Sequence, residues 1–107
     1  MCGIFGIIGK TKIYPKEMNK LINFAFRRGK DSSGIMYYDN AYKVKKADFD
    51  IKKLKKRINF KKASIVFGIA RLITNGNNDN QPFFKKNSAI FHNGIIINDK
   101  NLSELEN

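Results

Sequence analysis

The chain has 107 residues, of which 42% are hydrophobic, and it carries one cysteine and a formal net charge of +12. A chain of this length forms one small domain or part of a larger one. The single cysteine excludes an internal disulfide framework, and no apolar run is long enough for a membrane span. The N-terminus has neither the basic segment nor the long apolar run of a signal peptide, so we expect a cytoplasmic location.

The N-terminal stretch places a cysteine directly after the initiator methionine. Residues 2–8 form a short apolar run that predicts a buried strand, ended by Gly9. Removal of Met1 would leave Cys2 with a thiol and a free α-amine, and an α-amine with an ordinary pKa of about 7.7–8.0 can act as a base near neutrality. A thiol beside such a base is an activated nucleophile. The plainer alternative is a small buried hydrophobe at the start of a strand.

A helix and a hairpin are expected next. Pro15 suits the first position of a helix, and apolar residues at 18, 21, 22 and 25 give that helix one apolar face, which should stop before Gly29. The polar segment 27–34 predicts a loop. Residues 35–38 and 41–44 predict two strands joined by a turn at 39–40.

The segment 45–62 is rich in lysine. Ile51, Leu54 and Ile58 keep helical spacing, so we expect a helix whose lysines line a solvated face. The net charge also permits a nucleic-acid surface. No aromatic residues interleave with these lysines in the manner of a stacking platform, and we therefore favour the solvated face.

The C-terminal part is expected to contain further strands. Residues 64–70 predict a buried strand leading to Arg71 and then to an Asn- and Gly-rich loop, while 88–92 and 95–97 predict two more strands. Residues 101–104 resemble a helix start with an acid at the capping-box position. Because the chain stops within a turn of that start, we expect an incomplete domain, and the mixture of strands and helices predicts an α/β or α+β fold.

Four stretches of the chain form one pattern. They are Cys2-Gly3-Ile4-Phe5-Gly6, Arg28 to Gly34, Gly68 to Leu72 leading to Gln81-Pro82-Phe83, and His92-Asn93-Gly94. Their order and spacing resemble the class II glutamine amidotransferases, the N-terminal-nucleophile glutaminase domains that head asparagine synthetases, aminosugar-phosphate synthases and phosphoribosyl-pyrophosphate amidotransferases. The resemblance covers essentially the whole chain and implies an α+β fold, an αββα sandwich of mostly antiparallel sheets, with residues 1–107 as its N-terminal part.

The resemblance also implies an activity and roles for single residues. The family splits the side-chain amide of L-glutamine and passes ammonia to a synthase domain or subunit, and we expect no cofactor. Cys2 matches the nucleophile, with its own α-amine as the base. Asn93, through its side-chain amide, and Gly94, through its backbone N–H, match the oxyanion hole. Arg71 matches the clamp on the glutamine α-carboxylate, and Thr74 lies where the family places a substrate-contacting threonine.

Each role has a physical reason and a plainer alternative. Fixed neutral donors stabilise the oxyanion of amide hydrolysis, but an Asn-Gly pair between apolar runs is also a hairpin signal. A guanidinium matches a carboxylate in geometry as well as in charge, but Arg71 could be a surface ion-pair partner. The segment 31–34 is as good a turn as a site. We interpret His92 as a packing residue and expect no metal site, because no second His, Cys or carboxylate cluster is nearby.

Two features separate this sequence from the family pattern. Arg27 and Lys30 stand where a histidine and a proline are common, and no residue matches the family's acid for the substrate α-amino group, because Asp99 and Glu104 come too early. An inactive fragment of the same fold is therefore one alternative. A basic nucleic-acid-binding module, which rests on the net charge of +12 alone, is another. The ammonia acceptor stays open, since 31–34 favours asparagine synthetases and 92–96 favours aminosugar-phosphate synthases.

Overall fold

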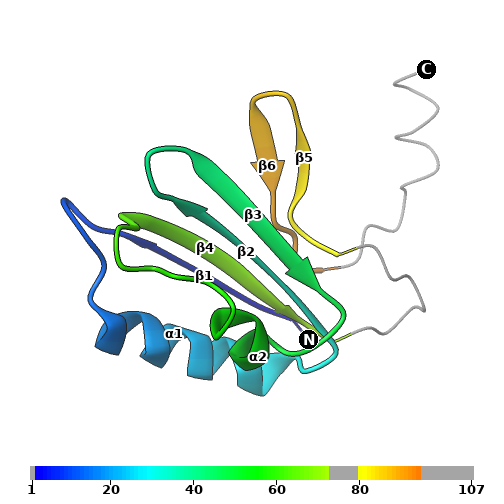
Figure 1. The fold of residues 1–107 in the computed structure, drawn as a ribbon. Coiled ribbons are helices and arrows are strands. Elements are labelled where there is room, and N and C mark those ends of the chain that lie inside the picture. The colour runs from blue at the N-terminus through cyan, green and yellow to red at the C-terminus, as the bar shows by residue number, and fades with distance from the viewer. Residues whose placement is uncertain (1, 73–79, 95–107) are drawn as a thin grey trace.

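The computed structural model describes residues 2–72 and 80–94. Two helices lie on one face of a four-stranded sheet, and a short hairpin lies apart from the helices (Figure 1). The elements in chain order are β1 (Gly3–Ile8), α1 (Pro15–Arg28), β2 (Ser32–Tyr38), β3 (Tyr42–Ala47), α2 (Ile51–Lys55), β4 (Ile65–Arg71), β5 (Phe83–Lys85) and β6 (Ser88–Ile90).

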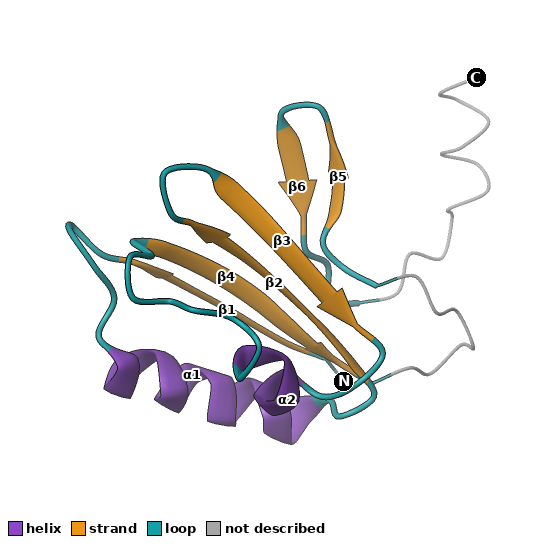
Figure 2. Cartoon of the chain, viewed as in Figure 1, coloured by secondary structure: helices purple, strands orange, loops and turns teal. Residues whose placement is uncertain are grey.

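Both sheets are antiparallel throughout the described residues. The larger sheet has the strand order β1-β4-β2-β3, so β4 lies between β1 and β2, and β5 pairs with β6 in a separate two-stranded sheet (Figure 2). This arrangement confirms the expected mixture of helices with mostly antiparallel sheets. It is compatible with the αββα sandwich that the resemblance implies.

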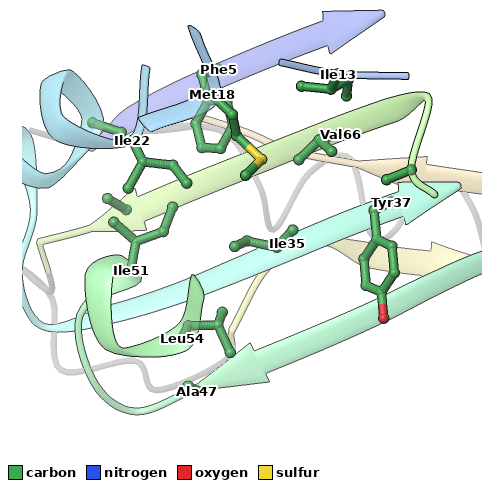
Figure 3. Close-up of a cluster of buried hydrophobic side chains, with 13 residues drawn as sticks. Phe5, Ile13, Met18, Ile22, Ile35, Tyr37, Ala47, Ile51, Leu54 and Val66 are labelled. Atoms are coloured by element: carbon green, nitrogen blue, oxygen red, sulfur yellow. The ribbon is translucent and has the colours of Figure 1, made fainter. Parts of the chain in front are cut away.

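The core forms between the helices and one face of the larger sheet. Because side chains alternate along a strand, Phe5 of β1, Ile35 of β2 and Val66 of β4 point toward the same face, where they meet Ile22 of α1 and Ile51 of α2 (Figure 3). Ile35, Ile51 and Val66 are completely buried. Burial of these aliphatic side chains is the main favourable contribution to folding.

The first helix follows its sequence signals closely. Pro15 lies in its first turn, and Met18, Ile22 and Ala25 form the buried stripe. The helix ends at Arg28, because the next residue, Gly29, has an extended backbone with φ −164°. The expected end before Gly29 is confirmed.

Two expectations about the middle of the chain are wrong. Residues 45–47 belong to β3, and only Ile51–Lys55 form a helix, because strand pairing with β2 holds the first part of this segment. Asp50 caps the short helix by accepting a hydrogen bond from the Lys53 N–H at 3.0 Å. The expected loop at 27–34 is also too long, since Ser32 and the two residues after it begin β2 and are buried.

The hairpin of β5 and β6 was only partly expected. The predicted strand 88–92 is shorter, ending at Ile90, and β5 was not predicted because its three residues are exposed and give no buried pattern. The predicted strand 95–97 and helix start 101–104 lie outside the described residues. Within the described ranges, no helix is long and apolar enough to cross a membrane.

The assignment of the core predicts that replacing two isoleucines of the same sheet by alanine will reduce stability by different amounts. Ile35→Ala should lower the free energy of unfolding by about 2–5 kcal/mol, because it leaves a cavity against both helices. Ile8→Ala, at a position 71% exposed, should change it by less than about 0.5 kcal/mol. Chemical denaturation of both variants measures this difference, and equal losses would contradict the assignment of the buried face.

Candidate active site

Cys2 lies at the end of two paired strands. It immediately precedes β1, whose register with β4 pairs Gly3 with Ala70. The Cys2 Sγ is 3.9 Å from the Leu72 carbonyl oxygen, and the cysteine is half-buried. Strand pairing thus holds the thiol beside a segment that lies 70 positions further along the chain.

A pocket of about 300 Å³ opens beside Cys2. Its wall comes from the start of β1, from the C-terminal half of α1 and from Asn93. The Asn93 Nδ2 donates a hydrogen bond to the Cys2 carbonyl oxygen at 2.9 Å. The two residue types needed for amide hydrolysis, a thiol nucleophile and a neutral amide donor, therefore lie next to each other.

Arg28 is a pocket residue to which sequence reasoning gave no role. It is the last residue of α1, and it lines the pocket together with Cys2 and Asn93. In the sequence, Arg28 stood out only as the first residue of the Arg28–Gly34 stretch. Its guanidinium brings a permanent positive charge to a pocket in which a thiolate or an oxyanion would form.

The loop after Arg28 runs directly against the end of β4. A Cβ added at Gly29 would lie 2.6 Å from the Leu72 nitrogen and 2.7 Å from the Ala70 oxygen, so only glycine permits this approach. Asp31 then donates its backbone N–H to the Arg71 carbonyl oxygen at 2.9 Å. These contacts lock the Arg28–Gly34 stretch onto the strand that leads to Arg71.

Gln81 connects the segment that contains the β5–β6 hairpin to the Arg28–Gly34 stretch. A Cβ at Gly34 would overlap the Gln81 backbone, and Gln81 itself is only 6% exposed. Its Oε1 accepts a hydrogen bond from the His92 N–H at 2.6 Å. The His92 side chain is exposed, so the predicted packing role of His92 is wrong, and its backbone makes the structural contact instead.

The remaining predicted site residues are placed as follows. Arg71 is the last residue of β4, half-buried and paired in register with Ser32, and it does not line the pocket beside Cys2. Gly94 is exposed, with φ +152°, and follows Asn93. Thr74 lies outside the described residues. The described parts of the chain contain no group of three His, Cys, Asp or Glu that could hold a metal ion.

Comparison with known proteins finds relatives along nearly the whole chain. The chain is 36% identical over 112 residues to a protein of Methanococcus maripaludis named glutamine–fructose-6-phosphate aminotransferase (isomerizing). The match covers 98% of this chain and 18% of that protein. This comparison confirms the resemblance to the class II glutamine amidotransferases. Proteins of the same name from Agrobacterium fabrum and Bradyrhizobium diazoefficiens are 36% and 31% identical over 110 residues.

The chain spans only 18% of the length of these three relatives. No family model matches the chain, and no solved structure matches it.

The contact between Gly34 and Gln81 gives a prediction for the stability of this chain. Gly34→Ala should lower the free energy of unfolding by about 1–3 kcal/mol, because the added methyl meets backbone that cannot move aside. It should also speed hydrogen exchange of the His92 amide, since Gln81 is displaced. Gly6→Ala is the matched control on the same face, because its methyl meets only the ring of Phe67. An unchanged exchange rate at His92 in folded Gly34→Ala would contradict this linkage.

Proposed function

We propose that this chain hydrolyses the side-chain amide of L-glutamine, with Cys2 as the nucleophile. The observation that carries the proposal is the pocket in which Cys2 and Asn93 meet, with the Asn93 amide 2.9 Å from the Cys2 carbonyl oxygen. The resemblance to the class II glutamine amidotransferases supports the same substrate. Removal of Met1 is part of the proposal, because the Cys2 α-amine serves as the base.

The proposed reaction proceeds through a covalent intermediate. The α-amine takes the thiol proton, and the sulfur attacks the glutamine amide carbon to form a tetrahedral oxyanion. The leaving nitrogen takes a proton from the α-ammonium and departs as ammonia, which leaves a thioester on Cys2. Water then attacks the thioester, which releases glutamate and returns the proton to the thiol.

Asn93 and Gly94 are proposed as the donors to the oxyanion. A side-chain amide has two N–H groups, and the contact with the Cys2 carbonyl oxygen uses one of them. The second N–H remains for the oxyanion, and the Gly94 backbone N–H supplies the other donor. Neutral donors held in place before the reaction stabilise the charge as it forms.

Arg71 and Thr74 are proposed to hold the rest of the substrate. Arg71 would bind the glutamine α-carboxylate through two parallel N–H groups. Its place at the end of β4 supports this role, because the next residue, Leu72, has its carbonyl oxygen 3.9 Å from the Cys2 Sγ. Thr74 would contact the substrate nearby. Arg28 would add positive charge to the wall of the pocket.

The ammonia is proposed to pass to a synthase domain or subunit. The relatives are named glutamine–fructose-6-phosphate aminotransferase, which favours a sugar phosphate as acceptor over aspartate or phosphoribosyl pyrophosphate. Residues 1–107 would then act as the N-terminal part of the glutaminase domain, without a cofactor and in the cytoplasm.

Replacement of the nucleophile tests the proposal directly. Cys2→Ala should abolish ammonia release from glutamine, because no other cysteine is present, while the thermal midpoint stays close to that of the parent. Intact-mass measurement of the active parent should show a chain beginning at Cys2. Activity in a preparation that retains Met1 would refute the α-amine as base. A parent that neither releases ammonia nor is labelled at Cys2 by an electrophilic glutamine analogue would favour the inactive-fragment alternative.

The proposed clamp gives a second kinetic prediction. Arg71→Lys keeps the charge but loses the two-pronged contact, so KM for glutamine should rise by about tenfold. The kcat should change little, because the carboxylate is held equally in ground and transition states. Arg27→Lys, at an exposed position outside the pocket, is the matched control. An unchanged KM in Arg71→Lys would remove Arg71 from the substrate site.

A further inference from the structure

A second pocket lies between the end of β3 and α2. Its volume is about 630 Å³, which falls within the range of small-molecule sites. It shares no residue with the pocket beside Cys2. The proposed glutamine chemistry therefore leaves this second pocket unexplained.

Three cations line the second pocket: Lys45, Lys46 and Arg57. Two of them are positioned by aromatic rings. The Arg57 Cζ is 4.7 Å from the ring centroid of Phe49, and the Lys46 Nζ is 5.0 Å from that of Phe84. A guanidinium stacked on a ring keeps its N–H groups in their own plane, available to another partner.

No carboxylate neutralises these cations within the described parts of the chain. The ion pairs found there join Lys43 to Asp39 and Lys53 to Asp50. Asp48 is the single acid of the pocket lining, and its Oδ1 accepts a hydrogen bond from the Asn80 Nδ2 at 2.8 Å. Because neighbouring residues of a strand point to opposite faces, the Lys46 ammonium lies over Phe83 and Phe84, away from the face of Lys45. Lys45 and Arg57 are therefore the cations that can face a ligand in the pocket.

The pocket also has an apolar side. Leu54 of α2 is 4% exposed, and Phe49 and Ile58 are half-buried. All three line the pocket together with the cations. A ligand that matches this lining has an anionic group at one end and an apolar body at the other.

We propose that the second pocket binds a phosphomonoester that carries an apolar or aromatic body. A phosphomonoester is nearly a dianion at neutral pH, so it can pair with Lys45 and Arg57 at the same time. The planar guanidinium of Arg57 can contact two phosphate oxygens at once, with Lys45 as a second charge. Phe49, Leu54 and Ile58 would cover the apolar body.

Titration with phenyl phosphate tests this proposal. Binding is followed by calorimetry and by NMR of the Leu54 and Ile58 methyl groups, which should shift and saturate together. Lys45→Gln with Arg57→Gln should raise Kd by about tenfold or more, because charge-assisted hydrogen bonds are lost. Lys16→Gln with Lys20→Gln removes the same charge from exposed positions of α1 and should raise Kd by less than about threefold.

Further arms separate the parts of the proposal. Arg57→Lys keeps the charge but loses the planar guanidinium, so it should still weaken binding of phenyl phosphate. This conservative variant replaces the double variant as the test if the double variant fails to fold. Inorganic phosphate should bind more weakly than phenyl phosphate, since it has no apolar body. Equal weakening by both double variants would overturn the proposal in favour of general charge attraction. Absence of saturation, or tighter binding of a single-stranded oligonucleotide that displaces phenyl phosphate, would overturn it as well.

Discussion

The pairing of β4 with both β1 and β2 is the constraint on which the candidate site depends. β1 and β2 both run antiparallel to β4, and Ala70 is the register partner of Gly3 on one side and of Ser33 on the other. The Cys2 thiol and the Arg28–Gly34 stretch therefore meet at the end of β4 that carries Arg71. Slippage by one residue would move every side chain of a strand to the opposite face, so burial of the core also fixes the register of the site.

Several residues of the four stretches act through the backbone rather than through their own chemistry. Gly29 and Gly34 permit close approach of the Leu72 and Gln81 backbones, and the Gln81 side chain holds the backbone N–H of His92. Asn93 then reaches the Cys2 carbonyl oxygen. A series of short contacts thus joins residue 34 to residue 2 through the segment 81–93. This linkage explains why residues far apart in the sequence belong to one motif pattern.

Local patterns predicted the elements that have a buried face. Helix α1 follows its apolar spacing and its N-terminal proline, and β1 and β4 are apolar runs bounded by polar segments. The prediction was wrong where pairing partners outweigh local spacing, as in residues 45–47, which pair with β2. For Arg28 and Gln81 the sequence indicated membership of a motif but no role, because their roles depend on contacts across the fold. The catalytic and binding roles of Cys2, Asn93, Gly94, Arg71 and Thr74 are predictions.

Most lysines of the segment 45–62 are exposed, as expected for a solvated face, and several cations of the chain also lie over aromatic rings. Cations do lie against aromatic rings, but the pairing occurs in space rather than along the chain: Lys30 and Lys52 both lie over Phe26, and Arg57 lies over Phe49. Stacking of nucleic-acid bases requires aromatic faces that are open, whereas these faces are covered by the protein's own cations. The same contacts hold the cations in fixed positions without neutralising them. Such an arrangement suits a local site for a small anion better than a continuous nucleic-acid surface.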